Sequence, residues 1–80
     1  MQLTDNQYTF LAQQQAQFDS LIQSQYISYL DGNWLNGLGD LYRQFFNEPF
    51  KANCVACVKR AMTLMYNKME EYRANKTAQQ

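Results

Sequence analysis

Residues 54–72 carry the most informative pattern of apolar and polar positions in the chain. At 100° per residue, as in an α-helix, their apolar side chains cover an arc of roughly 200°, whereas a surface helix commonly buries a stripe little wider than about 100°. The arc consists of Cys54, Val55, Cys57, Val58, Ala61, Met62, Leu64, Met65, Tyr66, Met69 and Tyr72. Lys68 alone interrupts it, and its aliphatic stem can lie along apolar surface. We therefore predict a helix at about residues 54–73 that is either central in its own domain or shared with a second molecule.

A first helix is predicted at about residues 5–29. Thr4 is a favourable N-cap, and Gln7 completes a Thr-x-x-Gln capping box. One face of this helix carries the apolar residues Tyr8, Leu11, Phe18, Leu21, Ile22 and Tyr29. Two serines with modest helix propensity follow, and the later apolar residues fall out of phase with this face. We therefore expect a bend or an early end between about Ser24 and Leu30.

A short second helix is predicted at about residues 34–47, with an apolar arc of about 140°. The arc contains Trp34, Leu35, Leu38, Leu41, Tyr42, Phe45 and Phe46. Gly37 and Gly39 each cost about 1 kcal/mol relative to Ala inside a helix, so either the helix begins near Gly39 or the glycines permit close packing.

Together these patterns predict a single all-α domain that covers residues 1–80. Two long helices flank a short one, and residues 75–80 form a frayed polar tail. The linkers are short, about 2 to 6 residues, and linkers of this length favour antiparallel neighbours. We expect a small three-helix bundle that dimerisation may complete.

Charge is distributed unevenly along the chain, although the net charge is zero. Residues 1–50 contain five acidic side chains and a single arginine, whereas residues 51–80 contain six basic and two acidic side chains. Opposite charges of this kind steer association. We expect the two parts to attract each other, either within one chain or between two chains.

The apolar face of residues 54–73 needs more cover than the rest of the chain is expected to supply. Gln14, Gln15 and Gln25 project near the apolar face of the first helix, where an unpaired buried amide costs roughly 1 to 3 kcal/mol. That face is therefore either partly exposed or paired across an interface. We expect a non-enzymatic protein-interaction or assembly module with a protein partner, most simply a second copy in a homodimer. Its expected partner-binding residues are Val58, Met62, Met65, Met69 and Tyr72, with Trp34 and Phe50 as aromatic anchors.

The Cys54-x-x-Cys57 motif is the one feature with evident chemical potential. Its place at the start of a helix, near Lys51 and Lys59, favours thiolate and is compatible with a redox pair. The chain lacks the preceding strand of thioredoxin-like motifs, and one chain lacks the four ligands of a structural zinc site, although two chains could supply four thiolates. Both cysteines also lie in the apolar arc, where a free cysteine behaves as a small hydrophobic residue. Three interpretations of the motif stay open: core thiols, a redox pair and an intersubunit zinc site. We favour core thiols.

Other function classes find little support in the sequence. Without His, paired carboxylates or a Gly-rich phosphate loop, we expect no catalytic residues, no cofactor and no metal. Nucleic-acid binding by the basic carboxy-terminal segment is a second alternative, but Glu70 and Glu71 interrupt its exposed strip. Residues 1–7 do not resemble a signal peptide, and no apolar run reaches the ~20 residues of a membrane span. We expect a cytoplasmic protein with reduced thiols, of a kind that would suit an accessory or inhibitor protein of a phage or other mobile element.

Overall fold

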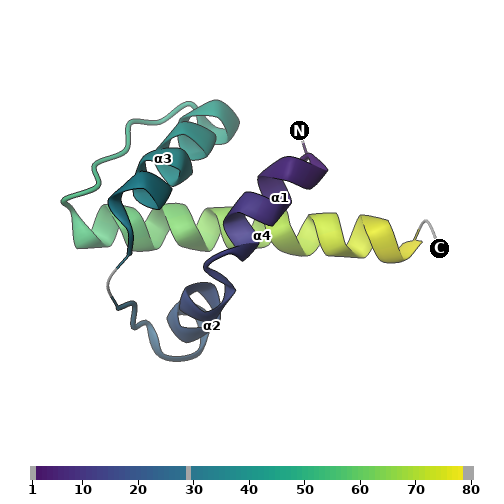
Figure 1. Cartoon of the computed structure of the whole chain (residues 1–80), viewed down its shortest axis with the longest axis horizontal. Coiled ribbons are helices and arrows are strands. Elements are labelled where there is room, and N and C mark those ends of the chain that lie inside the picture. Colours follow the sequence, from purple (N-terminus) through teal and green to yellow (C-terminus); the bar gives the residue numbers. More distant parts are fainter. Residues whose placement is uncertain (1, 29, 79–80) are drawn as a thin grey trace.

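The structure, a computed structural model, describes residues 2–28 and 30–78, and within these ranges it contains four helices and no strand. The helices are α1 (Asp5–Ala12), α2 (Gln15–Ser24), α3 (Gly32–Phe46) and α4 (Val55–Ala78). Figure 1 shows α4 as a long rod beside the three shorter helices, each of which contacts it. The all-α prediction is therefore confirmed, whereas the predicted number of three helices is wrong. None of the described helices is long and apolar enough to cross a membrane.

The predicted first helix is divided into α1 and α2 at Gln13 and Gln14. Its start forms as predicted, because the Thr4 hydroxyl accepts a hydrogen bond from the Gln7 N–H (3.1 Å) and the Gln7 side chain accepts one from the Thr4 N–H (2.9 Å). At the division, the N–H groups of Gln13 and Gln14 donate to carbonyls three residues back. Gln14 also leaves helical geometry, with φ −114° and ψ 35°. This tightened turn redirects the chain, so that α1 and α2 point in different directions (Figure 1).

The early end predicted between Ser24 and Leu30 is confirmed. α2 ends at Ser24, and Gln25 adopts the left-handed conformation with φ 59°. Its N–H still donates to a carbonyl in the last turn of α2, so the helix closes as a left-handed cap. The predicted place of Tyr29 on the first helix lies outside the described residues.

The two interior glycines of α3 permit close packing, and they do not mark the start of the helix. A Cβ atom added to Gly37 would overlap the ring of Phe10, and one added to Gly39 would overlap the ring of Phe50. Trp34 stacks on Phe10 with the ring centroids 5.7 Å apart, and its indole N–H donates to the Phe10 carbonyl at 3.1 Å. The glycines thus let aromatic side chains from α1 and from the segment before α4 lie against the α3 backbone.

The helices α3 and α4 begin at the same end of the molecule and are not the antiparallel neighbours that the sequence predicts. In Figure 1 residues 47–54 run back from the end of α3 to the start of α4. Eight extended residues can span about 26 Å, and the 15 residues of α3 extend about 22 Å as a helix. The linker is therefore long enough to return the chain along the whole of α3.

The core lies between α4 and the other three helices of the same chain. Its largest fully buried side chains are Phe18, Leu11, Leu21, Leu38, Met62, Met65 and Met69. The Nζ atom of Lys68 lies 5.9 Å from the centre of the Phe45 ring, as expected for a lysine whose stem follows apolar surface. The wide apolar face is thus largely covered within one chain, and α4 is central in its own domain.

The carboxy-terminal end of α4 is anchored to the amino-terminal segment. Tyr72 donates a hydrogen bond to the carboxylate of Asp5 (2.5 Å), and Lys76 forms an ion pair with the same carboxylate (3.2 Å). The frayed tail predicted from residue 75 is therefore wrong for residues 75–78, which continue α4, while residues 79–80 lie outside the described residues.

The attraction expected between the acidic and the basic part of the chain is realised within one molecule. Besides the Lys76–Asp5 pair, Arg60 of α4 lies 3.8 Å from the carboxylate of Glu48, which follows α3. The other ion pairs among the described residues join neighbours one turn apart within α3 or α4. These contacts make intramolecular complementarity sufficient to explain the uneven charge.

Candidate functional site

The amino-terminal end of α4 combines the cysteine pair with the main apolar pocket, and it is the candidate functional site. Cys54 directly precedes the helix, and its carbonyl accepts the first helical hydrogen bond from the Val58 N–H (3.0 Å). Its sulfur accepts a hydrogen bond from the Cys57 N–H (3.2 Å), as the side chain of a helix cap does. Cys54 therefore holds the capping position of α4.

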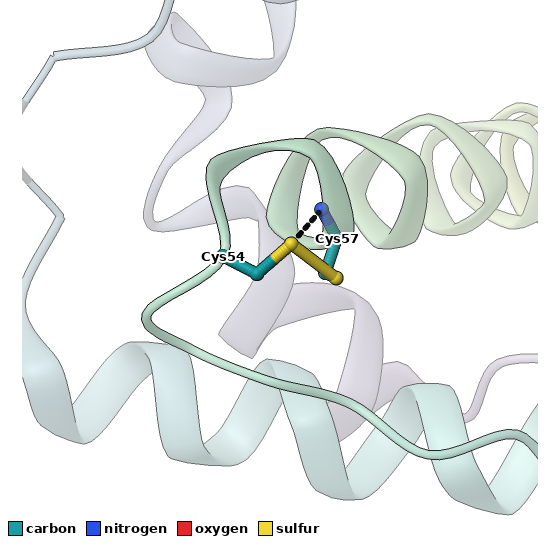
Figure 2. Close-up of a disulfide and its surroundings, with 2 residues drawn as sticks. All are labelled: Cys54 and Cys57. Atoms are coloured by element: carbon teal, nitrogen blue, oxygen red, sulfur yellow. Dashed lines mark hydrogen bonds between the residues drawn. A yellow bond between two sulfur atoms is a disulfide. The ribbon is translucent and has the colours of Figure 1, made fainter.

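Cys54 and Cys57 form a disulfide, with their Cα atoms 5.2 Å apart (Figure 2). The expectation of reduced thiols and of core cysteines is contradicted, because the two residues are bonded to each other and are only half-buried. A disulfide sulfur is not a thiolate, so this form of the protein cannot supply ligands to an intersubunit zinc ion. A disulfide is also the oxidised form that a redox pair adopts, so the arrangement is compatible with that interpretation.

Three basic residues lie close to the start of α4 in sequence. Lys51 and Lys59 lie close to the cysteines in sequence, and neither has an ion pair within the part of the chain that the structure describes. Arg60 shares the carboxylate of Glu48 with Tyr42, whose hydroxyl donates to it at 2.6 Å. This hydrogen bond raises the pKa of Tyr42, because only the protonated phenol can donate to the carboxylate. The positive end of the helix dipole at this turn favours a thiolate.

An apolar pocket of about 150 Å³ opens beside the same turn of α4. Its walls come from the segment after α2, from α3, and from the segment that enters α4. They are formed by Ile27, Ser28, Leu30, Leu35, Ala52, Asn53, Val55 and Val58. Ser28 is held in place by Gln17, whose side chain accepts a hydrogen bond from the Ser28 N–H (2.9 Å). Val55 is 64% exposed, which is unusual for a large apolar side chain beside a pocket.

The pocket lies closer to Cys54 than to Cys57, because Val58, which also lines it, is one turn after Cys54 on the same side of α4. Val55 and Cys57 are two residues apart, so their side chains differ in direction by about 160° around the helix. The pocket side of this turn faces the segment after α2. The pocket is therefore adjacent to Cys54 and faces away from Cys57.

A second, polar pocket of about 270 Å³ lies between the amino-terminal segment and the end of α4. Its lining includes Asp5, Tyr72 and Lys76, which already bind one another. The hydrogen bond from Tyr72, followed by the contact with Lys76, lowers the pKa of Asp5. These groups satisfy one another, and the pocket presents no unpaired charge for a ligand.

The structure places the predicted partner-binding residues mainly in the core. Val58, Met62, Met65, Met69 and Trp34 are buried, while Tyr72 stacks on Tyr8 and Phe50 packs against Gly39. The structure thus contradicts the reason for the prediction, namely that one chain cannot cover this face. The large apolar side chains that are exposed among the described residues are Ile22, Tyr26 and Val55. Of these, Val55 lies near the edge of the predicted arc, which is the only sequence signal of its exposure.

Comparisons of this chain with protein-family descriptions, with curated proteins and with solved structures find no match.

Proposed function

We propose that the protein is a small protein-interaction module that forms a homodimer through the surface around the apolar pocket. The observation that supports this proposal is the pocket itself, with Val55 exposed at its side. An apolar cavity of about 150 Å³ can hold a group the size of benzene. The pocket is thus large enough for one apolar side chain of a partner, and such buried anchors carry much of the binding energy of an interface.

A second copy of the chain is the occupant that the exposed side chains favour. On α2, Ile22 is 41% exposed and lies one turn after Asp19. On α4, Val55 lies one turn before Lys59. Neither charge has an ion pair within the described residues. One molecule thus carries an acidic patch, Ile22 with Asp19, and a basic patch, Val55 with Lys59. A twofold dimer can place each patch against its complement in the other copy.

This interface differs from the one predicted from the sequence. The predicted set centres on Met62, Met65 and Met69, which are fully buried within one chain. The proposed interface keeps α4 as the shared element but uses its exposed first turn. Substitution of the buried methionines would therefore report on folding, and it would not report on association.

The test is the mass of the full chain in solution, measured by sedimentation from about 1 µM to about 1 mM, a range that covers weak and moderate dimers. The wild type should be a dimer at the upper end of this range. Val55→Glu should be a monomer, because it places a charge at the pocket. Ala56→Glu is the matched control, since it adds the same charge at an exposed neighbouring position in the same helical turn and should leave the dimer intact.

Charge exchange tests the orientation of the two patches. Asp19→Lys and Lys59→Glu should each weaken the dimer by setting like charges opposite each other, and the double variant should recover most of the loss. A wild type that stays monomeric at the highest concentration would refute the proposal. Equal effects of Val55→Glu and Ala56→Glu would refute the assignment of the pocket.

Nucleic-acid binding is less favoured than protein binding. Arg60, Lys68, Arg73 and Lys76 of α4 each lie within 4.0 Å of a carboxylate, so the basic strip is largely neutralised by its own chain. The link to a phage or other mobile element stays a prediction, since no feature of the fold bears on it.

A further inference from the structure

We infer that Cys54 and Cys57 are a thiol–disulfide exchange pair, which acts on accessible disulfides with Cys54 as the attacking sulfur and Cys57 as the resolving sulfur. The inference goes beyond the proposed dimer, and it differs from the sequence-based expectation of a protein without catalytic residues. It rests on the position of the two sulfurs at the start of α4 (Figure 2) and on the partial exposure of the two residues.

The two sulfurs are not equivalent. The sulfur of Cys54 lies at the cap of a 24-residue helix and accepts a hydrogen bond from the Cys57 N–H at 3.2 Å. No hydrogen-bond donor to the sulfur of Cys57 is found within the described part of the chain. An N–H donor and the positive end of a helix both stabilise a thiolate, which is the reactive form of cysteine. Cys54 is therefore the better nucleophile once the pair is reduced.

Basic residues lie close to the cysteine pair in the sequence. Lys51 and Lys59 have no ion pair within the described residues. The positive charge of Arg60, one turn after Cys57, is shared with Glu48 at 3.8 Å. The lysines are therefore cations near the pair in sequence that no described carboxylate neutralises, and they can attract an acidic substrate.

The reaction balances as a two-electron exchange. The Cys54 thiolate attacks one sulfur of a substrate disulfide R–S–S–R′. This step forms the mixed disulfide Cys54–S–S–R and releases the thiolate R′S⁻. The released thiolate then takes a proton from water. Cys57 then loses its proton to water and attacks the Cys54 sulfur, which closes the Cys54–Cys57 disulfide and releases RS⁻. The substrate is reduced and the pair is oxidised. Two molecules of a small thiol such as glutathione restore the dithiol, and they leave as one disulfide.

The backbone geometry supports the closing step. The Cα atoms of Cys54 and Cys57 are 5.2 Å apart, within the usual range for a disulfide of about 4.4 to 6.8 Å. The first turn of α4 holds this separation, so Cys57 stays within reach of a mixed disulfide on Cys54. Cys54 and Cys57 are themselves partly exposed, so a substrate disulfide can reach the first turn of α4.

The first experiment uses the wild-type chain after reduction. Brief alkylation with iodoacetamide at slightly acidic pH, followed by peptide mapping, should label Cys54 at least about tenfold faster than Cys57, because only the thiolate reacts. The reduced protein should also accelerate the reduction of insulin disulfides by dithiothreitol. Equal labelling of the two thiols, or no acceleration, would overturn the inference.

The second experiment traps the intermediate with matched variants. With oxidised glutathione, Cys57→Ser should accumulate a stable mixed disulfide on Cys54, which mass spectrometry detects. Cys54→Ser should react at least about tenfold more slowly through Cys57. Circular dichroism of both variants checks that α4 is retained. If the two variants form mixed disulfides at equal rates, the assignment of roles is wrong. These readouts do not depend on dimerisation, so a monomeric protein leaves this test unaffected.

Discussion

At the scale of single residues, the carboxylate of Asp5 shows how an exposed group can tie two distant parts of the chain together. It accepts the hydroxyl of Tyr72 and the ammonium of Lys76, which follow it by 67 and 71 positions. The hydrogen bond from Tyr72 is the largest cause of the lowered pKa of Asp5, and the same bond raises the pKa of Tyr72. Each group is therefore held in the protonation state that the bond requires.

This bond predicts a pH window for its contribution to stability. The lowered pKa of Asp5 means that the contribution is lost as the pH falls below 3.8 and through the folded-state pKa. The raised pKa of Tyr72 means that it is lost again as the pH rises above 10.0 and through the folded-state pKa. We expect Tyr72→Phe to lower the urea midpoint of unfolding at neutral pH, with a difference that shrinks at both extremes. Tyr26→Phe is the control, because the structure gives the exposed Tyr26 hydroxyl no hydrogen bond to the described residues. A similar pH-dependent loss of stability in this control would contradict the role of the Tyr72–Asp5 bond.

At the scale of the helices, the local signals of the sequence predict where helices start better than where they bend. The capping box of Thr4 and Gln7 forms as predicted. The division at Gln13 and Gln14 has no comparable signal, because glutamine is a good helix former and neither Gly nor Pro is present. α1 and α2 each pack against α4. Contacts between distant segments of this kind cannot be read from the hydrophobic periodicity of one segment.

The linker and the site were predictable to different degrees. Residues 47–54 are long enough to reverse the chain or to return it along α3, so the relative direction of α3 and α4 could not be predicted from length alone. The place of Cys54 at a helix start was predictable from the chain pattern, but the disulfide with Cys57 was not, because the same spacing also suits free thiols. The exposure of Val55 depends on which edge of the apolar arc the other helices leave open.

The cap of α3 provides a prediction at this scale. The carboxylate of Asp31 accepts hydrogen bonds from the N–H groups of Asn33 (2.9 Å) and Trp34 (3.1 Å). Asp31→Ala should lower the free energy of unfolding by about 0.5 to 2 kcal/mol, because those donors lose their partner. Asp40→Ala is the matched control, since it removes the same charge from α3 and only an exposed ion pair with Arg43, worth about 0 to 1 kcal/mol. Urea unfolding of both variants measures the difference, and an Asp31→Ala protein as stable as the wild type would contradict the capping role.

At the scale of the whole molecule, α4 is the element on which the other three helices pack. The sequence correctly identified the helix with the widest apolar face, and it gave two explanations for that width. Burial of Met62, Met65 and Met69 within one chain favours the first, a helix central in its own domain. In the proposed dimer, the second molecule would cover only the exposed first turn of α4.

This division between core and surface can be measured by two substitutions in α4. Met65→Ala should lower the free energy of unfolding by about 2 to 5 kcal/mol, because Met65 is fully buried and its loss leaves a cavity. Val55→Ala should change it by no more than about 0.5 kcal/mol when the protein is dilute enough to be monomeric, because Val55 is 64% exposed. Urea unfolding at low protein concentration makes the comparison. Equal losses for the two variants would contradict the placement of the core.

The central position of α4 also determines when the chain can fold during synthesis. The ribosome releases α1, α2 and α3 first, and these helices of 8, 10 and 15 residues are too short to be stable alone. Until residues 55–78 have emerged, Leu11, Phe18 and Leu38 have no core to enter. The nascent chain therefore presents exposed apolar residues of the kind that chaperones bind, and the described residues form a folded domain only once α4 has emerged.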